Sequence, residues 1–156
     1  MSTPSGTKTG FNQVRIAETL EVDGAVIFES GISAPKNVSA TSGATKTLAS
    51  SESGTVFVQT ASSGTTTYTL PAATAGLEYT FVCGNANGEI LITPATGDAI
   101  VTKIHSAQDG TALAPAAGTG IKNTAATNVA GDSITLVALD TTTWYGTSII
   151  GLWASQ

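Results

Sequence analysis

Short apolar segments alternate with polar turns along most of the chain, from residue 53 to residue 153. Each segment is rich in Val, Ile, Thr, Tyr or Phe and is bounded by Gly, Ser, Asn or Pro, a pattern typical of β-strands. The clearest segments are 54–58, 65–71, 79–83, 89–93 and 132–137. The pattern predicts an all-β fold whose body is an antiparallel β-sandwich or is barrel-like.

The connections between these segments also carry signals. Residues 84–88 read Gly-Asn-Ala-Asn-Gly between two strands, and because Asn and Gly tolerate positive φ they predict a hairpin loop. Residues 49–54 predict a turn or a single helical turn, with Ser50 or Ser51 as its cap. Residues 105–131 show the weakest pattern and read as a long excursion that neighbouring subunits could order. No segment predicts a helix of three turns.

The N-terminal part differs from the rest of the chain. Residues 1–10 are mostly Ser, Thr, Gly and Pro, and we expect no fixed structure there until a partner binds. Residues 30–47 form a linker-like stretch of small polar residues. The apolar residues between them are Phe11, Val14, Ile16, Leu20, Val22, Val26 and Phe28. We therefore divide the chain into an extended arm with its linker, residues 1–45, and a β body, residues 46–156.

Composition narrows the classes of partner. Hydrophobic residues make up 41% of the chain, enough for a core, whereas charged residues make up only 11%, against roughly 25% in an average domain. The net charge is −5 and the six Lys and Arg residues are scattered, which argues against nucleic acid as a partner. No apolar run reaches the roughly 20 residues of a membrane span. The N-terminus lacks the apolar region of a secretory signal, so we expect synthesis in a cytoplasm and no membrane partner.

Residues able to support catalysis or bind a metal are scarce. His105 is the only histidine and Cys83 the only cysteine, so an ordinary zinc site is excluded. A serine nucleophile would need His105 as its base, yet no Gly-x-Ser-x-Gly turn is present. Cys83 lies within an apolar strand segment, which predicts a buried, unreactive thiol. We predict no catalytic residues, no cofactor and no metal.

Two further groups of residues have competing interpretations. Paired carboxylates can hydrolyse glycosides, but the candidate acids all occur in turns, where Asp commonly bonds to nearby backbone. These acids are Asp98, Asp109, Asp132 and Asp140.

The aromatic residues Trp144, Tyr145 and Trp153 could stack on sugar rings. Because they alternate with apolar residues in a terminal segment, we favour a core or subunit-interface role and predict the interface.

Several segments of the chain resemble small β domains of phage virion proteins. These segments are residues 47–58, 68–82, 131–137, 143–146 and 151–154. The resemblance covers residues 47–154 and is to head decoration (cement) proteins, with related segments in tail-fibre-like proteins. It implies a structural, non-enzymatic protein on the outer surface of the capsid, bound to the major capsid protein.

The low charge and the 105–131 excursion indicate surface buried between subunits, so we expect a homotrimer. We also expect the apolar residues of the arm to bind the capsid. The alternative function is a tail-fibre or spike-type adhesin module that binds a host surface glycan. A chain of 156 residues leaves little room for both an attachment domain and a receptor-binding tip, which favours decoration.

Overall fold

The computed structural model describes residues 36–156 except 103, 106–111 and 114–118, and these belong to one compact unit that begins at residue 35. Strands dominate this part of the chain, and its only helical element is the 3-10 turn η1 (Ser50–Glu52). The predicted all-β class is therefore confirmed. The seven apolar residues predicted for the arm lie outside the described residues.

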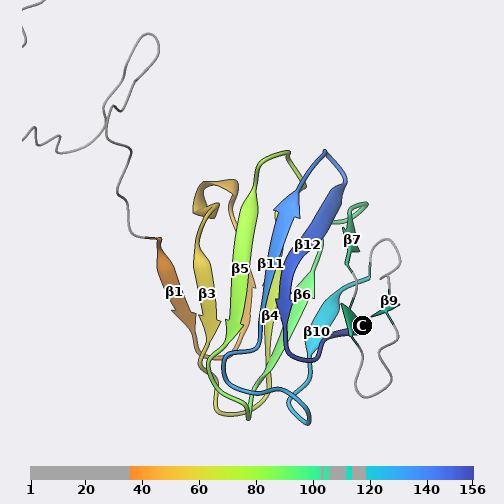
Figure 1. The fold of residues 1–156 in the computed structure, drawn as a ribbon. Helices are drawn as coiled ribbons and strands as arrows, with labels where there is room; N and C mark the ends of the chain where they lie inside the picture. Colours follow the sequence, from red (N-terminus) through yellow and green to blue (C-terminus); the bar gives the residue numbers. More distant parts are fainter. Residues whose placement is uncertain (1–35, 103, 106–111, 114–118) are drawn as a thin grey trace, which may run out of the picture. The chain divides into compact units, whose positions relative to one another are not determined.

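Two sheets form the unit, and a short pair of strands accompanies them (Figure 1). The six-stranded sheet has the spatial order β1 (Val38–Thr41), β3 (Val56–Gln59), β5 (Glu78–Cys83), β11 (Ser133–Ala138), β12 (Thr143–Ile150) and β7 (Ala99–Val101). The five-stranded sheet has the order β13 (Ala154–Ser155), β10 (Ile121–Asn123), β6 (Glu89–Thr93), β4 (Thr65–Thr69) and β2 (Thr45–Thr47). The remaining pair is β8 (Ile104–His105) with β9 (Ala112–Leu113).

The first six strands alternate between the two sheets. Strands β1, β3 and β5 pair in parallel in one sheet, and β2, β4 and β6 pair in parallel in the other. Each strand is thus reached after the chain has visited the opposite sheet, so neighbours in one sheet run in the same direction. The antiparallel arrangement predicted for the body is wrong for this half of it.

In the second half of the chain most described strands pair antiparallel, whereas the edge strand β7 pairs in parallel with β12. Strand β11 pairs antiparallel with β5 on one side and with β12 on the other. Strand β10 pairs antiparallel with β6 and with β13. The β11–β12 register shifts between Thr135 and Leu136, which is a β-bulge. Both sheets are consequently mixed.

The core lies between the inner faces of the two sheets. Strands β5 and β11 alternate regularly between half-buried and fully buried residues, the pattern of strands with one face in a core. Aromatic rings from both sheets meet there: the ring centroids of Phe57 and Tyr68 are 5.7 Å apart, and those of Tyr68 and Phe81 are 5.0 Å apart. Large rings bury much apolar surface and lock the sheets together.

All five predicted strand segments form strands, β3 to β6 and β11. Three connections differ from their predictions. Residues 84–88 join β5 to β6 in the opposite sheet, so they are not a hairpin loop. The second half of the linker predicted at 30–47 forms β1 and β2. The excursion predicted at 105–131 contains β10, a strand of the five-stranded sheet.

Candidate interaction face

The predicted interface aromatics separate into two groups. Trp144 and Trp153 are fully buried within the single chain, and the indole of Trp153 donates a 3.0 Å hydrogen bond to the Ile150 carbonyl. Trp144 packs against Tyr79, with 5.6 Å between ring centroids. The interface prediction is therefore wrong for both tryptophans, because their side chains serve the core. Tyr145 is half-buried on the opposite face of β12 and keeps its place as an interface candidate.

Cys83 is a free, buried thiol at the end of β5, as predicted. Burial raises its pKa, while a 3.4 Å hydrogen bond from Sγ to the Asn85 carbonyl opposes the rise. A thiol held in its neutral form is a poor nucleophile. His105 lies in strand β8, and its side chain is outside what the structure describes.

Of the four turn aspartates, Asp132 and Asp140 bind nearby backbone amides, as predicted, whereas Asp98 binds the amide of a residue distant in the sequence; Asp109 lies outside the described residues. Asp98 accepts a 2.8 Å hydrogen bond from the Ala73 amide, and Asp140 accepts one of 2.8 Å from the Thr142 amide. Asp132 accepts from the Val129 amide at 3.0 Å and from the Asn123 side chain at 3.0 Å. Each carboxylate thus holds a loop. Within the described residues, no group of three His, Cys, Asp or Glu side chains could hold a metal.

The outer face of the six-stranded sheet is the most distinctive surface of the body, and we call it the outer face. Register places its side chains in rows that cross the strands. One row is Ala40, Val58, Val82, Ser133 and Ile150, and the next is Val38, Val56, Thr80, Thr135 and Ser148. Ile150 is 59% exposed and Val38 is 68% exposed. The rows are made of aliphatic and hydroxyl side chains throughout.

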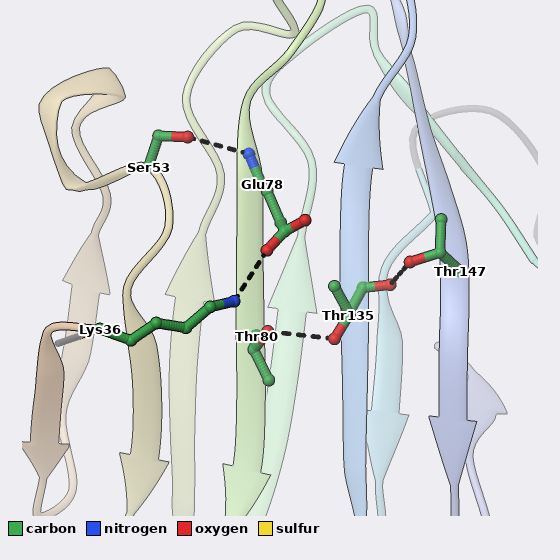
Figure 2. A network of polar contacts seen from close by, with 6 residues as sticks. All are labelled: Lys36, Ser53, Glu78, Thr80, Thr135 and Thr147. Carbon is green, nitrogen blue, oxygen red and sulfur yellow. Dashed lines mark hydrogen bonds and ion pairs between the residues drawn. The ribbon is translucent and has the colours of Figure 1, made fainter. Parts of the chain in front are cut away.

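Only one charged residue, Glu78, occurs in the six strands of this sheet. The Lys36 ammonium lies 3.1 Å from its carboxylate, and the Glu78 amide donates a 3.0 Å hydrogen bond to the Ser53 hydroxyl (Figure 2). The hydroxyls of Thr80 and Thr135 are bonded to each other at 3.0 Å (Figure 2). Hydroxyls that already have partners lose less free energy when a surface leaves water. The face is therefore suited to burial against another protein.

The outer face of the five-stranded sheet differs in its charge. Leu91 lies there among threonines, and Lys122 and Glu89 also point outward, since they alternate with buried neighbours. The Thr65 hydroxyl donates a 3.1 Å hydrogen bond to the Glu89 carboxylate. Charged side chains are depleted from the centres of protein interfaces. Of the two outward faces, the one on the six-stranded sheet is the better interface candidate.

Sequence reasoning missed this face, although a signal for it was present. A strand with one face in solvent normally alternates apolar and polar residues, whereas Val56-Phe57-Val58 is apolar at consecutive positions. The pairs Phe81-Val82 and Ile149-Ile150 do the same in β5 and β12. Apolar residues on both sides of a strand indicate that its second face is also covered.

The chain matches no protein-family model and no curated protein sequence at a significant level. No helix in the described part of the chain is long and apolar enough to cross a membrane. The fold and the outer face are thus the features on which a function can be argued.

Proposed function

We propose that this protein is a phage capsid decoration (cement) protein, which binds the outer surface of the major capsid shell and stabilises it. The observation that carries the proposal is the outer face of the six-stranded sheet, which is nearly uncharged and carries hydroxyls that bond to one another. The resemblance of residues 47–154 to decoration proteins supports the same function. The role is structural and involves no catalysis, cofactor, nucleic acid or membrane.

The proposed architecture is a two-sheet β-sandwich body with an extended N-terminal arm. Rings from both sheets meet in one core, which supports a sandwich over an open barrel. In the virion, three copies form a homotrimer on the outside of the head, after synthesis in the host cytoplasm. The arm residues Phe11 to Phe28 anchor the trimer to the shell, and the outer face, with Tyr145, contributes to contacts between proteins.

A decoration protein acts by mass action. A molecule that binds only the assembled shell lowers the free energy of the assembled state. A trimer that touches several capsid subunits adds a multivalent gain, because the second and third contacts form at high effective concentration. The small number of charged groups on the outer face makes such binding less sensitive to salt than an ionic contact would be.

The test is a comparison of virions with and without the protein. We expect heads that lack it to release DNA at a lower temperature and after a milder osmotic shock, and to regain stability when the purified protein is added back. Adsorption to host cells should be unchanged. The adhesin alternative predicts the opposite pair of results, normal head stability and lost adsorption, and that outcome would refute the proposal.

A further inference from the structure

One end of the two sheets is open in the described part of the chain. There the edge strand of the six-stranded sheet is β1 (Figure 1), and the edge strand of the five-stranded sheet is β2. At the other end the edge strands are β7 and β13, and β8, which pairs with β9, lies against β13. An uncovered sheet edge presents unpaired backbone groups, and proteins usually cover or block such edges. An end where both sheets present an edge is a ready acceptor for added strands.

The outward backbone groups of β1 can be identified from its bonds to β3. The Asn37 carbonyl accepts from the Val56 amide and the Thr41 carbonyl accepts from the Thr60 amide, both at 2.8 Å. Because backbone groups alternate in direction along a strand, those of Val38 and Ala40 point to the open side.

The same argument applies to β2. The Ala44 carbonyl accepts from the Thr67 amide at 3.2 Å, and the Leu48 amide donates to the Thr69 carbonyl at 2.9 Å. The backbone groups of Thr45 and Thr47 therefore point to the open side. The open end offers donors and acceptors from both sheets.

The chain passes back and forth between the two sheets, and the regular number of residues between paired positions indicates which segment could add to this end. In the six-stranded sheet, Val38 pairs with Val56, and Val56 pairs with Thr80. Between each residue and its partner, the chain passes once through the five-stranded sheet. The paired positions of β2, β4 and β6 in the other sheet are separated by similar lengths of chain. We count back from the first residue of each edge strand by the number of residues that separates partners in the six-stranded sheet. Counting back from Val38 of β1 reaches positions 14–20, and counting back from Thr45 of β2 reaches positions 21–27. This segment holds most of the apolar residues that precede the described unit.

We propose that the open end is a strand-addition site and that its occupant is the segment of residues 14–28 from a second copy of this chain. The inference rests on the proposed function, because it supplies the contact that holds the homotrimer together. All copies present the same edge strands, β1 and β2. A segment whose spacing suits the edges of its own chain therefore also suits the edges of a neighbouring copy. Exchange of such a segment around a three-fold axis gives every copy one donated and one received segment, and the ring closes.

Photo-crosslinking of the full-length protein tests the site and its occupant. p-Benzoylphenylalanine replaces Val38, whose side chain is 68% exposed at the edge. Nitrogen-15-labelled and unlabelled chains are unfolded, mixed in equal amounts and refolded, and the cross-linked peptides are then identified by mass spectrometry. We expect cross-links from position 38 to peptides within residues 11–28, with about half of the linked pairs carrying one labelled and one unlabelled peptide. Links to that segment only within one chain, or links to other regions, would overturn the proposal.

Proline at the edge gives an independent test. Ala40→Pro and Thr47→Pro each remove an outward amide that the described sheets do not use. Ala40→Ser and Thr47→Ser keep the amide and serve as matched controls. We expect each proline to weaken self-association about tenfold, the effect of losing one or two hydrogen bonds, while the unfolding temperature of the body stays within a few degrees of the control.

The two failures can be told apart. Proline variants that remain trimeric as tightly as their serine controls would refute the strand-addition site, and the proposed function would stand if they still stabilise heads. A wild-type protein that forms the exchanged trimer but leaves head stability unchanged would refute the function and keep the site.

Discussion

At the scale of single residues, one loop of the body depends on a buried carboxylate. The Asn123 side chain donates to Asp132 at 3.0 Å and to the Leu152 carbonyl at 2.9 Å, so it ties β10 to the loop before β11 and to the chain end. Gly151 has a φ of +88°, and a Cβ there would collide with the Asp132 carboxylate. Glycine is needed at this position for both its conformation and its size.

Gly151→Ala should therefore destabilise the body by about 2 kcal/mol, because backbone strain is added to the collision with the Asp132 carboxylate. Gly131→Ala is the matched control, since Gly131 has a φ of +102° but open space around its Cβ position. The control carries backbone strain alone, about 1 kcal/mol. Urea unfolding of both variants measures the difference, and equal losses would show that the carboxylate does not restrict the site.

Glu52 stabilises another loop, and this stabilisation depends on pH. Its carboxylate accepts a 2.9 Å hydrogen bond from the Ala49 amide and lies 2.9 Å from the Lys46 ammonium. The hydrogen bond from Ala49, followed by that from Lys46, lowers the pKa of Glu52 below its ordinary value of 4.5. Because the folded pKa is below the unfolded one, this stabilisation is present above about pH 4.5 and is lost as the pH falls through the folded pKa.

Glu52→Gln should cost about 0.5 kcal/mol at pH 7, as expected for a partly exposed pair. The difference between the variant and the wild type should shrink as the pH falls below 4.5. Thermal unfolding from pH 3 to pH 7 measures this, with Glu89→Gln as the control for a general loss of negative charge. A difference that stays constant with pH would show that ionisation of Glu52 does not stabilise the fold.

At the scale of elements, local sequence predicted the strands but did not predict the sheets. Turn formers around Val- and Thr-rich segments located β3 to β6 and β11, because alternation and β-propensity are local properties. The Asn-Gly loop at 84–88 could equally close a hairpin or carry the chain across the core. It crosses, because the inner residues of β5 and β6 face each other from opposite sheets. Short strands such as β1, β2 and β10 were missed, since three or four residues carry too little pattern.

The outer face also requires knowledge of the register. Val58, Val82 and Ile150 are far apart in the sequence, and only the pairing of β3, β5, β11 and β12 brings them into one row. Burial of Trp144 and Trp153 was equally inaccessible, because aromatic residues suit a core and an interface alike.

Val82→Glu tests whether the outer face binds the shell. The side chain is half-buried at the centre of the face, and a carboxylate there would have to lose its water on docking. We expect the variant to fold and to bind heads at least about tenfold more weakly. Leu91→Glu, a half-buried outward position on the five-stranded sheet, is the matched control and should bind normally. Equal binding by both variants would show that the shell contacts another surface.

At the scale of the whole molecule, the described unit has an apolar core of its own. Its buried hydrophobic residues run from Leu48 to Trp153, and they include rings from both sheets. We therefore expect the stability of the body not to depend on the N-terminal residues, and we propose that their apolar side chains bind partners. This division assigns folding to one part of the chain and attachment to the other.

Deletion of residues 1–30 separates the two properties. We expect the shortened protein to unfold within a few degrees of the full chain, because no residue of the described core is removed. It should sediment as a monomer and should no longer attach to heads, since both the trimer contact and the capsid anchors lie in the deleted segment. Analytical ultracentrifugation and co-sedimentation with heads measure these outcomes, and deletion of residues 1–9 alone is the control that should keep both properties. A body without residues 1–30 that still decorates heads as tightly as the full chain would show that attachment belongs to the sheets themselves.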